Sequence, residues 1–264
     1  MLKCQVAGIE AVAAATRHRF PRHSHDQFGI GVIDQGAQKS HSCLGLVEAG
    51  PGDIITVNAG EVHDGMPIGD AGRSWRMLYL DPALIATASR DISAGKTEAY
   101  EFRLPVLRDA RIARQFRQLF ACLTRGAAEP GLAMLQEQSL LRLLAAMRRL
   151  SGKPVQAGSM PAAIALARQL IDDDPTAPIA LADLAQVSGL SRFQVLRGFV
   201  RATELTPHAY LVQRRIALAR RLIGSGSGLA DAAVASGFAD QSHMTRIFVR
   251  KYGVSPGAYA AATA

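Results

Sequence analysis

Polar and basic residues gather at the start of a helix-like segment near the C-terminus. The run 240–243 reads Asp-Gln-Ser-His, and Arg246 and Arg250 follow it at helical spacing. Side chains of these types hydrogen-bond base edges, and the first turn of a recognition helix is the part that enters the major groove of DNA. Met244 and Phe248 supply an apolar anchor behind it. The stretch therefore predicts a DNA-reading helix.

The same pattern occurs twice in the chain. Ala233 stands four residues before Gly237, as Ala185 does before Gly189, and a small residue at this distance from a turn glycine is typical of a helix-turn-helix. Five more residues recur 49 positions later: Arg197, Phe199, Arg201, Pro207 and Tyr210 correspond to Arg246, Phe248, Arg250, Pro256 and Tyr259. Two helix-turn-helix units are expected, joined by a single helix over 208–226, so that one chain could read two major-groove segments about 34 Å apart.

The arginines of the two copies are the strongest candidates for contact with DNA. Arg197 and Arg246 are the expected base readers, because arginine can bond guanine through two hydrogen bonds. Secondary candidates for base contacts are Arg192, Gln194, Gln241, Ser242 and Thr245. Phosphate contacts are expected from Arg201, Arg214, Arg215, Arg250 and Lys251.

These residues resemble the signature of the AraC family of bacterial transcriptional regulators. The matching positions are Gly237, Phe238, Asp240, Gln241, Ser242, His243, Arg246, Phe248, Gly253, Ser255, Pro256 and Tyr259. The resemblance covers roughly the last hundred residues and implies a sequence-specific regulator, an activator, with double-stranded DNA and RNA polymerase as partners. Glu204 departs from the pattern, since Gly253 stands at its place in the second copy. A glutamate there costs about 1 kcal/mol in a left-handed helix end, or the helix ends differently.

Charge and cysteine content limit the class of protein. The chain of 264 residues is long enough for two domains and has a formal net charge of +8. From Ser191 onwards ten Lys and Arg face three acidic residues, a balance of +7, as a polyanionic partner requires. Cys4, Cys43 and Cys122 are odd in number and widely spaced, which predicts neither a disulfide framework nor a cysteine-zinc site. With no convincing signal peptide and no apolar run of about 18 residues, a cytoplasmic protein is expected.

Short apolar runs separated by glycine-rich turns fill residues 20–80. Strands are expected at 28–34, 53–58 and 76–80, and many short strands with frequent glycines suggest a barrel or jelly roll. The pair His23 and His25, with the later run 51–63 that ends at His63, resembles the two motifs of a cupin barrel. It also resembles the sensor domain that commonly precedes an AraC-type DNA-binding half.

The histidines could act in three ways. Metal-binding cupins use two histidines at alternate strand positions, a carboxylate and a third histidine, so His23, His25 and His63 are weak candidates for a metal site. The expected carboxylate is missing, because Gln27 or the following Phe stands in its place. The alternatives are a small-molecule pocket, which we favour, and a structural role at the barrel mouth. No cofactor is assigned.

Further polar residues beside the predicted strands are candidates for the same pocket. Gln27, Glu61, Arg76 and Tyr79 join the three histidines in the expected ligand-binding set. An arginine in the pocket would favour an anionic ligand.

Helical periodicity begins near residue 106. An apolar stripe from Ile112 to Leu123 predicts one helix, and a second is expected over 132–150 after a break at 126–131. In the resembling family such a helical pair commonly supports dimerisation, so a homodimer is expected; the pair could instead cap the barrel core. The expected domains are a cupin-like β-barrel with a helical pair for sensing and dimerisation (1–150), a linker (151–160) and an all-α DNA-binding domain (161–264).

The leading hypothesis is a transcriptional regulator controlled by a small-molecule effector bound in the barrel. One rival is a metal-dependent cupin enzyme or metal sensor fused to a DNA-binding domain. The absence of another acid-base constellation in the sequence argues against an enzyme. A second rival, an architectural DNA protein without sensing, leaves the barrel pattern unexplained.

Overall fold

The protein is described from a computed structural model of residues 1–264. The described residues are 1–2, 4, 6–42, 44–93, 100–124, 132–150 and 160–263. Cys43, the predicted helix break at 126–131 and residues 151–159 of the predicted linker lie outside them. The chain divides into two compact units, Met1–Val155 and Gln156–Ala264, which are taken separately below.

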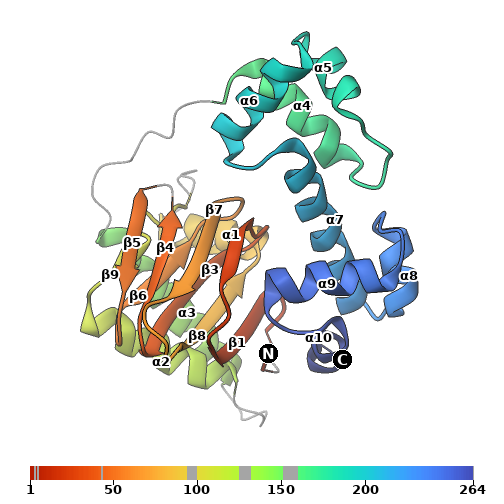
Figure 1. Cartoon of the computed structure of the whole chain (residues 1–264). Coiled ribbons are helices and arrows are strands. Elements are labelled where there is room, and N and C mark those ends of the chain that lie inside the picture. The colour runs from red at the N-terminus through yellow and green to blue at the C-terminus, as the bar shows by residue number, and fades with distance from the viewer. Residues whose placement is uncertain are drawn as a thin grey trace. The chain divides into compact units, whose positions relative to one another are not determined.

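The first unit contains two β-sheets (Figure 1). Its strands are β1 (Ile9–Thr16), β2 (Phe20–Ser24), β3 (Phe28–Gln35), β4 (Gln38–Ser42), β5 (Gly45–Ala49), β6 (Ile54–Val57), β7 (Val62–Pro67), β8 (Arg73–Leu80) and β9 (Val106–Leu107). One sheet has the order β1-β8-β3-β6-β9 and the other β2-β7-β4-β5, and the pairs between these strands are antiparallel. The predicted barrel is therefore two sheets rather than one closed cylinder.

Alternation along β8 separates the two faces of the five-stranded sheet. Leu78 and Leu80 belong to the large core formed with the helices, whereas Met77 packs with Ile33 and Ile55 on the opposite face. That second face meets the other sheet. The rings of Trp75 on β8 and Phe20 on β2, for example, lie 6.0 Å apart.

Helices cover the outer face of the five-stranded sheet (Figure 1). They are α1 (Pro82–Ile92), α2 (Ala110–Leu123) and α3 (Leu132–Arg149). The predicted helical pair corresponds to α2 and α3, which pack together and contribute residues such as Phe116 and Leu143, both fully buried. The sequence patterns missed α1, although Asp81 followed by Pro82 is a helix start signal. The Asp81 carboxylate makes no capping bond and instead accepts a hydrogen bond from Gln27.

The second unit is entirely helical in its described part. Its helices are α4 (Ala162–Asp173), α5 (Leu181–Ser188), α6 (Arg192–Thr203), α7 (Pro207–Gly224), α8 (Leu229–Ala235), α9 (Gln241–Tyr252) and α10 (Pro256–Thr263). The long helix α7 packs against α4 and α6 near one end and against α8, α9 and α10 near the other (Figure 1). The predicted joining helix is thus confirmed as α7. A β-rich first unit and a helical second unit agree with the predicted fold class.

Both predicted turns are present. Gly189 ends α5 with φ of 65°, and Gly237 lies between α8 and α9 with φ of 80°. Both values fall in the left-handed region that favours glycine. A Cβ at Gly237 would also lie 3.2 Å from the Thr176 backbone, so this position needs glycine for space as well. Ala233 is fully buried where α8 and α9 pack. Among the described helices, none combines the length and the apolar character that a membrane crossing requires.

Candidate functional site

The first turn of α6 is held by a reciprocal capping box. The Ser191 hydroxyl accepts from the Gln194 backbone N–H at 3.3 Å, and Gln194 Oε1 accepts from the Ser191 N–H at 2.9 Å. Gln194, a predicted base reader, therefore caps the helix with its side-chain oxygen. Arg192 and Arg197 are exposed, while Val195 and Phe199 on the other face are fully buried.

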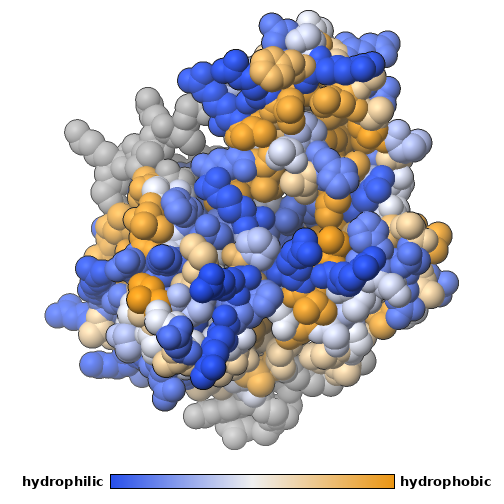
Figure 2. Space-filling view, in the orientation of Figure 1, coloured by the Kyte–Doolittle hydropathy of each residue, from blue (hydrophilic) through white to orange (hydrophobic). Residues whose placement is uncertain are grey.

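The first turn of α9 carries the second set of polar groups. The Asp240 carboxylate caps the helix by accepting from the His243 N–H at 2.7 Å. A shallow pocket of about 440 Å³ is lined by Asp240, Gln241, Ser242, Thr245 and Arg246. Gln241, Ser242 and Arg246 are exposed, and hydrophilic side chains lie over α9 in Figure 2. The arrangement presents hydrogen-bonding groups at a helix start, which suits base edges.

The predicted phosphate contacts divide into two groups. Arg201 and Arg250 are exposed on the last turns of α6 and α9. Arg214 instead pairs with Asp172 on α4, with Nε 2.9 Å from Oδ1, and Arg215 donates to the carbonyls of Pro175 and Ala177 at 2.7 and 3.1 Å.

Lys251 is also placed differently from the prediction. It is 5% exposed, and its ammonium lies 5.2 Å from the centre of the Tyr252 ring. Arg214 and Arg215 thus bond groups of their own unit and Lys251 is buried, which sets the three apart from the exposed Arg201 and Arg250. Spacing alone could not separate Arg214 and Arg215 from solvent-facing arginines, because their partners lie on α4 and at residues 175 and 177.

One exposed residue of α6 was missed by sequence reasoning. Phe193 is 65% exposed in the first turn, and the Arg197 guanidinium lies 5.6 Å from its ring centre. Ser242 occupies the equivalent position in the second copy, 49 residues later. The sequence could have indicated Phe193, because it is an aromatic residue on the polar face of an amphipathic helix, where apolar core residues are not expected.

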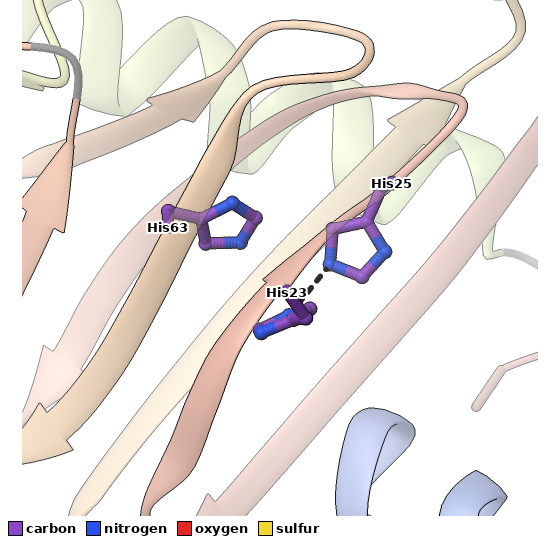
Figure 3. Close-up of side chains that lie close together, drawn as sticks. All are labelled: His23, His25 and His63. Carbon is purple, nitrogen blue, oxygen red and sulfur yellow. Dashed lines mark hydrogen bonds between the residues drawn. The ribbon is translucent and has the colours of Figure 1, made fainter. Parts of the chain in front are cut away.

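In the first unit, three histidines from two strands come together. His23 on β2 is paired directly with His63 on β7, and His25 follows immediately after β2. Their potential ligand atoms all lie within 4.8 Å of one another. His23 Nε2 and His25 Nε2 are 3.1 Å apart, and the three rings face a common space in Figure 3. His23 and His25 are 4% and 7% exposed.

Backbone carbonyls fix two of the three rings. His23 Nδ1 donates to the Pro21 carbonyl at 2.7 Å, and His63 Nδ1 donates to the Glu61 carbonyl at 3.2 Å. A carbonyl can only accept, so the proton of each neutral ring sits on Nδ1 and the lone pair on Nε2. Tyr79 borders the cluster, with its ring centre 5.0 Å from that of His25.

The other predicted pocket residues form hydrogen bonds outside the three histidines. Gln27 donates to Asp81 Oδ1 at 2.8 Å and Glu61 Oε2 accepts from both nitrogens of Asn58. Arg76 lies on the helix-covered face of β8, where it forms two hydrogen bonds of 2.8 and 2.6 Å with the Asp34 carboxylate. That carboxylate raises the pKa of Arg76. Arg76 is therefore not beside Tyr79 and the histidines, because neighbours with odd separation on a strand face opposite ways.

A different arginine lies on the inner face. Arg73 is 5% exposed, and its guanidinium donates to Gln38 Oε1 at 2.9 Å and to the carbonyls of His18 and Gly65 at 3.2 Å each. Burial lowers its pKa to about 10. The parity of β8 was the available signal, since residues 73 and 79 share a face while 76 does not.

Comparison with known proteins matches two family models to two parts of the chain. The family model described as AraC-like ligand binding domain matches residues 6–158, more than half of the chain, and the one described as helix-turn-helix domain matches residues 184–262. YbfI of Bacillus subtilis (strain 168), named as an uncharacterized HTH-type transcriptional regulator, is 27% identical over 86% of this chain and 82% of its own length. The transcriptional activator NphR of Rhodococcus sp is 39% identical over 31% of this chain and 25% of NphR.

Solved structures of the same overall fold are found as well. An apo variant of ToxT from Vibrio cholerae superposes with a TM-score of 0.65 over 99% of this chain and 100% of ToxT, at 13% identity. Wild-type ToxT with a bound unsaturated fatty acid gives a TM-score of 0.63 over 98% of this chain and 97% of ToxT, at 14% identity. At this level of identity the likeness establishes the fold alone.

Proposed function

The chain belongs to the AraC family of transcriptional regulators, and from that premise we propose that it binds promoter DNA through α6 and α9. One observation carries the proposal: both helices present an arginine, Arg197 and Arg246, on the exposed face one turn in, backed by a fully buried phenylalanine. Each arginine would form two hydrogen bonds with a guanine, and each such pair discriminates by about 1–3 kcal/mol.

The neighbouring exposed residues complete the reading surface. Arg192, Gln241, Ser242 and Thr245 would contact further base edges, and Gln194 would do so with the amide group that its capping bond leaves to solvent. Phe193 would pack on the C5-methyl group of a thymine beside the guanine read by Arg197, since the two side chains are in contact. Arg201 and Arg250 would bind phosphates and set the register.

The first unit would regulate transcription by binding an effector. We assign sensing and dimerisation to residues 1–150, a linker to 151–160 and DNA binding to 161–264, in the cytoplasm. A small molecule beside His23, His25, His63 and Tyr79 would shift the balance between two states of a homodimer, and one of these states would engage RNA polymerase to activate transcription. Such a ligand acts only as far as it binds the two states unequally. We expect the protein to act by binding DNA and a ligand rather than as an enzyme.

Arginine-to-lysine substitutions test the DNA half directly. The probe is a duplex selected from a random library by the wild-type protein. Arg246→Lys and Arg197→Lys keep the charge but lose the two-pronged geometry, so each should lower specific affinity by about 10- to 100-fold and relax preference at one base pair, with an unchanged salt slope.

Arg201→Ala is the matched control. Loss of a phosphate contact should weaken binding to all sequences and reduce the salt slope by about 1. If Arg246→Lys behaved like Arg201→Ala, with every base preference intact, α9 would not be reading guanine through this residue.

A further inference from the structure

The histidine cluster of the first unit has the arrangement of a metal site rather than of three rings that merely fill space. We propose that His23, His25 and His63 bind a divalent first-row transition ion, such as zinc, through three nitrogens, and that the ion's remaining position takes the anionic group of the effector. The binding of the effector to the ion rests on the proposed function, whereas the metal site does not depend on it.

The hydrogen bonds already fix the donor atoms. His23 and His63 each give their Nδ1 proton to a backbone carbonyl, which orients the ring and directs the Nε2 lone pair away from that carbonyl. Histidines that bind metals nearly always donate their second ring N–H in this way, which makes them better ligands. A purely structural cluster does not require both rings to donate through Nδ1 and so leave Nε2 available.

The spacing of the rings is close to what an ion needs. Two nitrogens on one tetrahedral zinc, each at about 2.0–2.1 Å from the metal, lie about 3.3–3.4 Å apart. His23 Nε2 and His25 Nε2 are 3.1 Å apart, and one ring nitrogen from each of the three residues falls within 4.8 Å of the other two. In the metal-free state His25 Nε2 donates to His23 Nε2. On metal binding the ion replaces that proton, and His25 carries its proton on Nδ1.

The charge of the site points to its fourth ligand. Within the described part of the chain, the group of potential ligands contains the three histidines and no carboxylate. Gln27, at the place of the expected carboxylate, adds no negative charge, because its side chain is a neutral amide, which donates to Asp81 and Glu10. Three neutral imidazoles leave the ion with its full charge beside two buried rings, so an anion is strongly favoured in the remaining position.

The surroundings of the cluster fit an organic anion. The ring of Tyr79 lies 5.0 Å from His25 and that of Phe20 lies 6.3 Å from His23, measured between ring centres. Each of these two aromatic rings thus lies near one of the imidazoles. A carboxylate on an apolar body matches a metal flanked by aromatic rings better than inorganic phosphate does.

Cobalt(II) is the probe for the metal site. The full-length protein is stripped with a chelator and titrated with Co²⁺, whose visible absorption reports coordination. Wild type should bind one ion per chain. His63→Ala and His23→Gln should each weaken binding by about 100-fold or more, since they remove a ligand, and even the loss of a group that only hydrogen-bonds a ligand costs about 10- to 100-fold. Thermal unfolding of both variants checks that they are folded.

His41→Ala is the matched control. His41 lies on β4 in the same sheet, is exposed, and contacts Asp64 rather than the cluster. It should bind Co²⁺ like wild type. Failure of the wild type to bind, or equal binding by all four proteins, would overturn the site.

Acetate tests whether the remaining coordination position of the ion accepts an anion. DNA binding then distinguishes failure of the metal site from failure of the proposed function. Adding acetate to the Co²⁺ protein should change its visible spectrum, and an unchanged spectrum would remove the anionic ligand from the proposal. Binding of the stripped protein to the selected duplex is measured in parallel. DNA binding without any Co²⁺ binding defeats the metal site alone, whereas Co²⁺ binding without sequence-specific DNA binding defeats the proposed function alone.

Discussion

The two helix-turn-helix copies share a buried frame and differ at their exposed surfaces. Phe199 and Phe248 are both fully buried, and Gly189 and Gly237 both adopt the left-handed conformation at the turn. Side chains cap both recognition helices, a serine in α6 and an aspartate in α9. The repeat therefore duplicated the parts that position a helix.

The exposed first turns show what was not duplicated. α6 presents Phe193 stacked near Arg197, whereas α9 presents Ser242 beside Arg246 in a polar pocket. An apolar ring suits a thymine methyl, and hydroxyl and amide groups suit donors and acceptors on base edges. The same buried residues thus support two different exposed surfaces, so the two half-sites on DNA should differ in sequence.

The largest expected effect tests the shared frame. Phe199→Ala and Phe248→Ala each remove a fully buried ring, which should cost about 3–5 kcal/mol of unfolding free energy. If the frames are equivalent, the two losses should agree within about 1 kcal/mol in urea denaturation of the full-length protein. Val249→Ala, which is 39% exposed on α9, is the control and should change stability far less. A mild effect in one copy only would show that the repeat is not structural in both.

The helical unit could be predicted closely because its signals are local. The sequence predicted α7 and the turns at Gly189 and Gly237, and each of these depends on residues within a few positions of one another. The surroundings of Arg215 and Lys251 could not be predicted in the same way. Arg215 bonds the Pro175 carbonyl, 40 residues earlier in the chain, and Lys251 is 5% exposed, and local spacing reports neither fact.

The β-rich unit shows where local reasoning ends. The spacing of His23 and His25 predicted a shared face, and the structure brings them to His63, which is 38 residues further along the chain. The pairing of β2 with β7 decides that meeting, and it depends on long-range register. Arg76 was expected in the pocket because it is polar and lies beside a predicted strand, and Arg73 was overlooked because the strand was expected to begin only at residue 76, whereas β8 begins at Arg73. Gln27, which stands where the cupin pattern has a carboxylate, donates to Asp81, 54 residues further along the chain.

A smaller effect, on DNA affinity, is expected when the exposed residue of one copy is replaced by its counterpart in the other. Phe193→Ser gives α6 the residue that α9 carries at the equivalent position. If Phe193 covers a thymine methyl, the variant should lose about 0.8 kcal/mol of specific binding, about fourfold, which is the cost of exposing one such carbon group. The measurement is fluorescence anisotropy with the selected duplex.

Deoxyuridine supplies the control for this variant, because it removes only the methyl group from thymine. Placing deoxyuridine at each thymine in turn should reproduce the fourfold loss at one position with the wild type and have no effect there with Phe193→Ser. Equal sensitivity of both proteins at every position would argue that the phenylalanine does not touch the base.

The smallest effect concerns the ends of the two recognition helices. Glu204 ends α6 with φ of 59°, and Gly253 ends α9 with φ of 72°, so the first copy holds a glutamate in a conformation that favours glycine. Glu204→Gly should therefore stabilise the unit by up to about 1 kcal/mol, less whatever the greater freedom of glycine in the unfolded chain costs. The reciprocal Gly253→Ala should destabilise it by a similar amount, and the pair can be compared by thermal unfolding. Since both positions lie at the helix end away from the base-reading turn, neither substitution should alter base preference on the selected duplex. A loss of stability in Glu204→Gly would mean that the glutamate side chain contributes more than its backbone conformation costs, and the two copies would then differ in their frame as well as in their reading surface.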